Sequence, residues 1–336
     1  MRLNRYPGSS GRPSWSADGE KVAVRLNRQA IVVDRATEEV SFRLGDQNSN
    51  IGSPQFSPDG SKLAFDTYTQ TPGGKKQWAI QIADANGESP RFVVDHGRHP
   101  QWSPDGEKLA FSSYTDDFQT KVSTVRPDGT EQKVVSDLPH ATDFEWSPDG
   151  KLIAYEAGAL SGYQLRTVDV ETGTEKVLSD GDGGVFWDRT PTFSPSGQTI
   201  VFERRYKQFP AASLWTVETE TGQEKLLLQE FADVVDPTYS PDGKSLVFGS
   251  NHGGRGGLDL FRMDLDDLSL TQLTDQRGDE HSPAFSPDGH SIAYLNTDRR
   301  RDAGERQELH FTDVGNDVSS EENSNVQRSN CLRVGW

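Results

Sequence analysis

Short apolar runs recur along this chain at regular intervals, and polar turn residues separate them. Seven of the runs have three residues each and combine aliphatic with aromatic or alanine side chains. They are Val22–Val24, Leu63–Phe65, Leu109–Phe111, Ile153–Tyr155, Ile200–Phe202, Leu246–Phe248 and Ile292–Tyr294. Runs of this composition that are bounded by turn residues are typical of β-strands. The pattern therefore predicts an all-β chain.

A five-residue signature, aromatic-Ser-Pro-Asp-Gly or a close variant, precedes each of these runs. Its seven copies begin at Trp15, Phe56, Trp102, Trp146, Phe193, Tyr239 and Phe285. Proline presets φ at the first central turn position, aspartate suits the second, and glycine tolerates the positive φ that leads back into a strand. We therefore expect the signature to connect the first and second strands of each repeat.

The spacing of the signatures indicates the architecture. Their closing glycines are 41, 46, 44, 47, 46 and 46 residues apart. This is the period of a four-stranded propeller blade, and it is longer than an ankyrin or leucine-rich repeat. The third and fourth strands are clearest at Tyr163–Asp169 and Thr174–Ser179. We predict a seven-bladed β-propeller over residues 1–314, with blades that begin near residues 12, 53, 99, 142, 190, 236 and 282.

The two ends of the chain differ from the repeats. The seventh repeat has no convincing fourth strand after its third strand at Glu308–Asp313, whereas Arg2–Tyr6 is similar to the end of a fourth strand. We expect this N-terminal strand to complete blade seven, because closing the ring removes an exposed sheet edge. Residues 315–336 are polar and aperiodic, so they are predicted to be a disordered tail.

Composition limits the classes of partner. The formal charge of -17 and the pI near 4.8 argue against nucleic acid and anionic membranes, which bind basic surfaces. No apolar stretch approaches the length of a membrane span, so we expect no membrane insertion.

The first residues lack the apolar segment of a secretion signal, which predicts a cytoplasmic protein, or a periplasmic one if a leader is missing. Cys331 is the single cysteine, so an intrachain disulfide is impossible. We also expect a monomer.

The repeats resemble the TolB-type β-propeller repeat, a WD-like repeat with the Ser-Pro-Asp-Gly signature. The resemblance rests on the seven signatures and covers roughly Arg2 to Asp313. It implies a propeller of the kind found in the periplasmic protein TolB, which binds peptidoglycan-associated lipoprotein, and in some serine peptidases. The Gly-x-Ser-x-Gly nucleophile elbow of such peptidases does not occur in this sequence.

A site is expected on the propeller face opposite the signature turns. That face carries the connections that vary in length and chemistry, and binding residues are commonly found on such loops. Candidates at the mouth of the central channel are His99, His140, Asp143, Asp188, Arg189, Asp236, Glu280 and His281. Candidates in the outer loops are Arg204, Arg205, Lys207, Arg255, Arg299, Arg300 and Arg301.

The leading hypothesis is a non-catalytic scaffold, without cofactor, that binds a protein or peptide with complementary charges on this face. The alternative is a metal-dependent lyase or hydrolase that acts on uronic-acid oligosaccharides in the central channel. It follows from the resemblance to seven-bladed oligogalacturonate lyases, which bind a metal through histidines. In this chain the divalent ion would be held by His99, His140 and His281, since imidazole is a common ligand of such metals.

Overall fold

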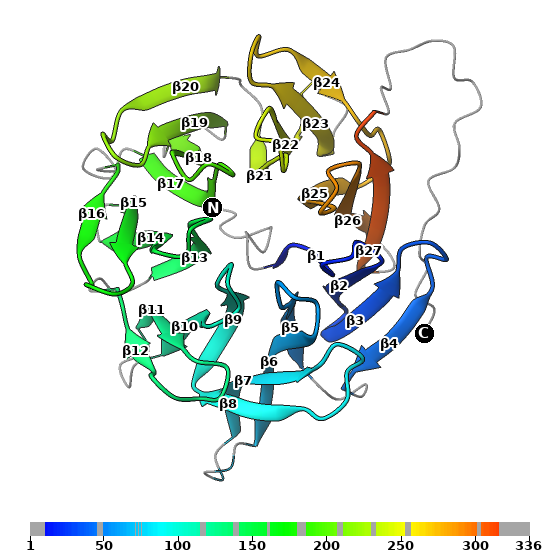
Figure 1. The fold of residues 1–336 in the computed structure, drawn as a ribbon. Coiled ribbons are helices and arrows are strands. Elements are labelled where there is room, and N and C mark those ends of the chain that lie inside the picture. The colour runs from blue at the N-terminus through cyan, green and yellow to red at the C-terminus, as the bar shows by residue number, and fades with distance from the viewer. Residues whose placement is uncertain are drawn as a thin grey trace.

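A ring of seven antiparallel sheets forms the structure, a computed structural model (Figure 1). The structure describes residues 11–45, 50–70, 72, 74, 76–114, 119–136, 141–159, 162–179, 186–206, 211–229, 233–252, 257–300 and 304–315, and within these ranges there is no α-helix. Accordingly, the described residues form no helix long and apolar enough to cross a membrane. The predicted all-β, seven-bladed propeller is confirmed.

Each blade begins with the strand nearest the central axis and adds its strands outward in chain order. Blade one contains β1 (Ser14–Trp15), β2 (Lys21–Leu26), β3 (Gln29–Asp34) and β4 (Val40–Leu44); blade two contains β5 (Ile51–Phe56), β6 (Lys62–Gln70), β7 (Lys76–Asp84) and β8 (Arg91–Asp95). Blade three contains β9 (Gly97–Trp102), β10 (Leu109–Tyr114), β11 (Thr120–Val125) and β12 (Lys133–Val134).

The remaining blades follow the same order. Blade four contains β13 (Ala141–Trp146), β14 (Leu152–Ala159), β15 (Gly162–Asp169) and β16 (Glu175–Val177); blade five contains β17 (Phe186–Phe193), β18 (Thr199–Tyr206), β19 (Ala212–Glu218) and β20 (Glu224–Gln229). Blade six contains β21 (Val234–Tyr239), β22 (Ser245–Ser250), β23 (Asp259–Asp264) and β24 (Leu270–Gln272). Blade seven contains β25 (Asp279–Phe285), β26 (Ser291–Arg300) and β27 (Gly304–Asp313).

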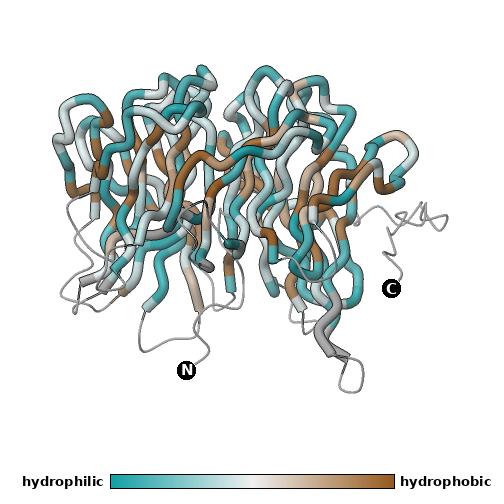
Figure 2. Tube along the Cα trace, turned by 90° about the horizontal axis from the view of Figure 1, so that it is seen from below, coloured by the Kyte–Doolittle hydropathy of each residue, from teal (hydrophilic) through white to brown (hydrophobic). Residues whose placement is uncertain are grey.

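Because consecutive strands are antiparallel, the signature turns all lie on one face of the disc. We call this face the signature end and the opposite face the loop end; Figure 2 views the disc from the side. In blade two the Ser57 hydroxyl donates to Asp59 Oδ1 at 2.6 Å and accepts from the Lys62 backbone N–H at 2.9 Å. Gly60 closes the turn with φ of 71°, in the region that glycine tolerates best.

The signature turns also pack against one another around the ring. A Cβ added at Gly106 would lie 3.7 Å from Cδ of Pro58 in the preceding blade, and one at Gly19 would lie 3.7 Å from Cδ of Pro287. The second contact joins the first blade to the last. The Ser-Pro-Asp-Gly signature therefore shapes the turn and also aligns neighbouring blades.

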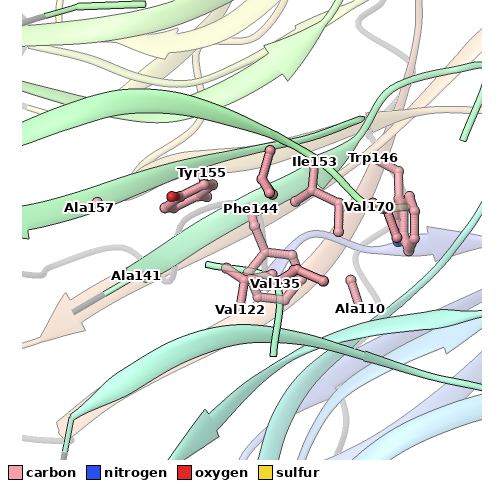
Figure 3. Close-up of a cluster of buried hydrophobic side chains, with 11 residues drawn as sticks. Ala110, Val122, Val135, Ala141, Phe144, Trp146, Ile153, Tyr155, Ala157 and Val170 are labelled. Carbon is pink, nitrogen blue, oxygen red and sulfur yellow. The ribbon is translucent and has the colours of Figure 1, made fainter. Parts of the chain in front are cut away.

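The core consists of apolar layers between neighbouring blades. Figure 3 shows Phe144 of blade four against Val122 and Val135 of blade three. Phe144 is 2% exposed, and burial of a side chain of this size stabilises the fold by about 1.5–3 kcal/mol. Trp146 Nε1 donates to the Gln101 carbonyl oxygen at 3.2 Å, so the signature aromatic also links these blades.

Blades seven and one close the ring through a similar layer. Leu26 and Ile31 of blade one belong to one buried cluster with Leu295 and Leu309 of blade seven. Trp15 Nε1 donates to the Ala284 carbonyl oxygen at 3.0 Å. In the described residues, blade seven has three strands; the predicted closing strand, residues 2–6, lies outside them, as does the predicted tail beyond residue 315.

Candidate functional site

The innermost strand of blades two to seven contains a β-bulge at the same position, three residues before the signature aromatic. Its pairing register shifts there, and the bulged residue has a positive φ. These residues are Ser53 (33°), His99 (54°), Asp143 (38°), Thr190 (49°), Asp236 (52°) and Ser282 (54°). A left-handed conformation costs a non-glycine residue about 1–3 kcal/mol, so the surrounding contacts must maintain it.

Carboxylates from the same blade or from the preceding blade supply such contacts. Glu203 of β18 accepts hydrogen bonds from the Thr190 hydroxyl at 2.9 Å and from the Asp236 backbone N–H at 2.8 Å. The Asp236 carboxylate in turn accepts from the Ser282 backbone N–H at 3.1 Å and from its hydroxyl at 3.0 Å. Blades five, six and seven are therefore linked by buried carboxylates near the axis.

A second group of charges joins blades four and five. Arg189 of β17 lies 3.4 Å from Glu156 through Nε and 3.7 Å from Asp143 through Nη2. Burial raises the pKa of Asp143 well above its usual range, and the neighbouring Glu156 raises it further. The Arg189 side chain is 21% exposed. Asp143 and Arg189, both members of the predicted channel-mouth set, thus keep some contact with solvent, whereas Glu156 is only 2% exposed.

Arg204 lies in β18 with its side chain only 5% exposed. Its Nε and Nη2 donate to Asp188 at 2.7 and 2.9 Å, and its Nη1 and Nη2 donate to Glu224, both at 2.8 Å. Its Cζ also lies 4.1 Å from the ring centre of Phe186 and 4.7 Å from that of Trp215. Arg204 therefore acts as a buried link within blade five.

The other predicted basic residues differ in their position and in whether the structure describes them. Arg205, the next residue of β18, is 24% exposed and pairs with Glu203 at 3.2 Å and Asp233 at 2.8 Å. Arg299 and Arg300 belong to β26. The candidates Lys207, Arg255 and Arg301 lie outside the described residues.

Two of the three histidines predicted as metal ligands, His99 and His281, lie within the described residues. Burial lowers the pKa of His99 to about 3, with further lowering from Arg98 and Arg25, so this ring is neutral near pH 7. His281 is buried, with Nδ1 3.0 Å from Ser282 Oγ and Nε2 2.9 Å from Thr297 Oγ1. His140 lies outside the described residues. Within the part of the chain that is described, no three His, Cys, Asp or Glu side chains gather in a way that could hold a metal ion.

Glu280, the remaining channel-mouth candidate, is fully buried in β25. Its carboxyl group accepts a hydrogen bond from the Thr274 hydroxyl. Burial raises the pKa of Glu280 to about 8, and the negative charge of Asp259 contributes to this rise. Its carboxyl group is therefore largely protonated at neutral pH.

Two cavities of about 310 and 440 Å³ lie at the signature end, at the centre of the ring, where the sequence did not predict a site. They adjoin, because Gln55, Gln101, Glu145 and Pro287 line both of them. The sequence predicted a site at the opposite end, because the turns at this end are uniform and the opposite connections vary. A signal was nevertheless present in the residue immediately before each signature aromatic, which varies in chemistry: Ser14, Gln55, Gln101, Glu145, Thr192, Thr238 and Ala284.

Arg12 and Glu145 are the side chains lining the larger cavity that belong to acidic or basic residues. Arg12 comes from blade one and reaches blades five and six: its Nη1 donates to Thr192 Oγ1 at 3.2 Å and its Nη2 to the Pro237 carbonyl oxygen at 2.6 Å. Burial raises the pKa of Glu145 to about 7, and the positive charge of Arg12 partly opposes the rise. The cavity therefore contains one permanent charge and one carboxyl group that titrates near neutrality.

Comparison with known proteins identifies the type of propeller. The sequence matches the TolB beta propeller domain family over residues 2–188 and 190–320. No curated protein matches it. Similar solved structures include TolB from Acinetobacter baumannii, with 18% identity, coverage of 91% of this chain and 79% of that chain, and a TM-score of 0.55.

Two oligogalacturonate lyase structures share the fold as well. The enzyme from Vibrio parahaemolyticus is 12% identical, covers 92% of this chain and 89% of its own, and has a TM-score of 0.67. An oligogalacturonate lyase in complex with manganese is 12% identical, covers 90% of this chain and 88% of its own, and has a TM-score of 0.64. At these identities the likeness concerns the fold alone.

Proposed function

The chain belongs to the TolB beta propeller domain family, and we propose that it is a non-catalytic binding protein that captures a protein or peptide on its loop end. The observation that carries this proposal is the fixed arrangement of charges on that side. Arg189 and Arg205 are each held by two carboxylates and are still partly exposed. Charges that are held in place before binding lose little freedom when a complementary partner docks, which favours recognition.

The outer basic residues extend this surface in the proposal. Asp233, the partner of Arg205, is 40% exposed, and together they place both signs of charge near the end of blade five. Arg299 and Arg300 are the last residues of β26, at the same end of blade seven, and Arg301 follows them in the sequence. A partner that carries acidic and basic groups in the matching order would be selected by this pattern.

A charge-reversal experiment tests the proposal. The intact chain, the variant R299E/R300E/R301E and the control K108E/K151E/K244E, which has the same charge change at the signature end, are used for affinity capture from native lysate. We expect one protein to be captured by the wild type and the control and lost with the arginine variant. Equal capture by all three, or loss with the control alone, would overturn the loop-end assignment.

One observation favours a second candidate, a metal-dependent lyase or hydrolase of uronic-acid oligosaccharides. His99 is held in its neutral form, the form in which imidazole binds metals, and two of the similar folds are oligogalacturonate lyases. His99, His140 and His281 would hold the ion. Elemental analysis after incubation with manganese and an ultraviolet assay with oligogalacturonate test this candidate. This candidate would be supported if the wild type took up metal and formed product and if H140A abolished both. It would be removed if the wild type neither took up metal nor formed product.

A further inference from the structure

The signature end has the construction of a ligand site. Proline rings and aromatic side chains from the turns form the walls of the two cavities, including Trp102, Trp146 and Pro287, and the polar side chains of Gln55 and Gln101 line both. Apolar walls with a few polar groups are typical of sites for small molecules and chain ends, and the volumes are also in the usual range. These residues are distinct from the loop-end residues of the proposed partner surface.

The contacts of Arg12 indicate what such a ligand would carry. Thr192 Oγ1 donates to the Pro237 carbonyl oxygen at 3.0 Å, so the two groups that accept from Arg12 are neighbours and occupy the same edge of its guanidinium, the edge formed by Nη1 and Nη2. The other edge contains Nε, which is buried and has no hydrogen-bond partner in the described structure. A buried donor without an acceptor is costly, and a carboxylate can accept from Nε and an Nη together.

We propose that this cavity is a second binding site, which takes a carboxylate group through the guanidinium of Arg12 beside Glu145. The carboxylate would come from the C-terminus of a peptide or from a small organic acid. Both offer the same planar pair of oxygens, and the apolar walls would contact the rest of the ligand. This site is independent of the partner proposed for the loop end.

Glu145 makes the site sensitive to pH. Arg12 is the charged group that acts on Glu145 in the described structure, and the other contacts of its carboxyl group are the uncharged Thr192 side chain and Phe193 backbone N–H. Burial raises the pKa of Glu145 to about 7, so a bound carboxylate meets a neutral neighbour below pH 7 and a negative one above it. Binding should therefore take up a proton, and the dissociation constant should rise about tenfold for each pH unit above 7.

Calorimetric titration of the intact chain tests the site. The probes are N-acetylated leucyl-phenylalanine with a free carboxyl terminus, the same dipeptide with an amidated terminus, and succinate, each at pH 6 and pH 8. We expect the free acid to bind at pH 6 at least about tenfold more tightly than the amide, and to weaken at pH 8. Tighter binding of the dipeptide than of succinate would assign the site to peptide ends, and the reverse would assign it to small acids.

Two variants separate the roles of the charged residues. R12Q should remove the difference between acid and amide, whereas E145Q should bind the acid at pH 8 as tightly as the wild type does at pH 6. Thermal unfolding checks that both variants fold; if R12Q does not, E145Q and the wild-type comparison of acid with amide still decide. Equal binding of acid and amide, no binding of either carboxylate at pH 6, or an unchanged pH dependence in E145Q would overturn the proposal.

Discussion

The loop end and the signature end of the ring use arginine in opposite ways. At the loop end, Arg204 has contacts on both edges of its guanidinium, with Asp188 and Glu224, and is almost completely buried. At the signature end, Arg12 contacts neighbouring acceptors on one edge and has an unpartnered Nε on the other. We therefore interpret Arg204 as a charge that stabilises its blade and Arg12 as a charge that can bind a ligand.

The bulge in the inner strands of blades two to seven helps to produce this difference. At the bulge, Thr190 makes a hydrogen bond with a carboxylate of its own blade, and Asp236 and Ser282 make hydrogen bonds with carboxylates of the preceding blades. After the bulge, the residue before the signature aromatic lines the central cavities, as Gln101 and Glu145 do. One strand therefore supplies structural contacts toward the loop end and cavity-lining groups toward the signature end.

The largest expected effect comes from removing the buried arginine. R204M leaves the carboxylate of Asp188 buried without its partner, and loss of one member of a buried ion pair typically costs about 3–5 kcal/mol. R12Q removes no ion pair within 4 Å that the described residues make, so its loss of stability should be smaller. Urea unfolding of both variants measures the difference. Similar losses of unfolding free energy would show that the two arginines do not differ in this way.

The repeats allowed the fold to be predicted because each signature residue has a local role. The serine hydroxyl donates a hydrogen bond to the aspartate carboxylate, as Ser57 does to Asp59, and the glycine adopts a positive φ. The strands predicted at Tyr163–Asp169 and Thr174–Ser179 correspond to β15 and β16, with small shifts at their ends. Local chemistry that recurs in every blade is visible in one sequence.

A smaller effect on stability is expected from replacing the buried Glu280 at the loop end. Its pKa in the folded protein is about 8, above its usual 4.5, so the unfolded chain loses its proton first as the pH rises. The folded state is therefore destabilised progressively between about pH 4.5 and pH 8. E280Q stays neutral and its amide oxygen can still accept from Thr274, so it should match the wild type at pH 5 and melt at a higher temperature at pH 9.

Melting temperatures of E280Q and E145Q across this range sharpen the comparison of the two ends. The pH effect of Glu145 has the same sign but should be complete near pH 7, because its folded pKa is about 7. As the pH rises, the gain in melting temperature of E145Q over the wild type should thus level off at a lower pH than the gain of E280Q. A wild-type protein whose stability does not change between pH 5 and pH 9 would contradict both assignments.

The candidate site was less predictable than the fold, because its contacts depend on strand register and on neighbouring blades. Arg204 was interpreted as a loop residue, and the sequence gives no sign that Asp188 and Glu224, 16 and 20 residues away, meet it across β17, β18 and β20. The signature-end cavities combine side chains from several blades, including Arg12, whose hydrogen-bond partner Thr192 is 180 residues away. Such pairs have no local pattern that a single sequence could show.

The smallest expected effect concerns one signature turn. Asp59 accepts hydrogen bonds from the Ser57 hydroxyl at 2.6 Å and from the Ser61 backbone N–H at 3.0 Å. D59A should therefore lower the unfolding free energy by about 1 kcal/mol, as loss of exposed hydrogen bonds usually does. Blade five offers a matched control: Ser196 stands at this position, 3.1 Å from Ser194 Oγ, so D59S should retain part of the stability. Urea unfolding distinguishes the two variants. The turn is exposed and its hydrogen bonds do not involve Arg12, so neither variant should change carboxylate binding. If D59A did change it, the signature turns would contribute directly to the binding site.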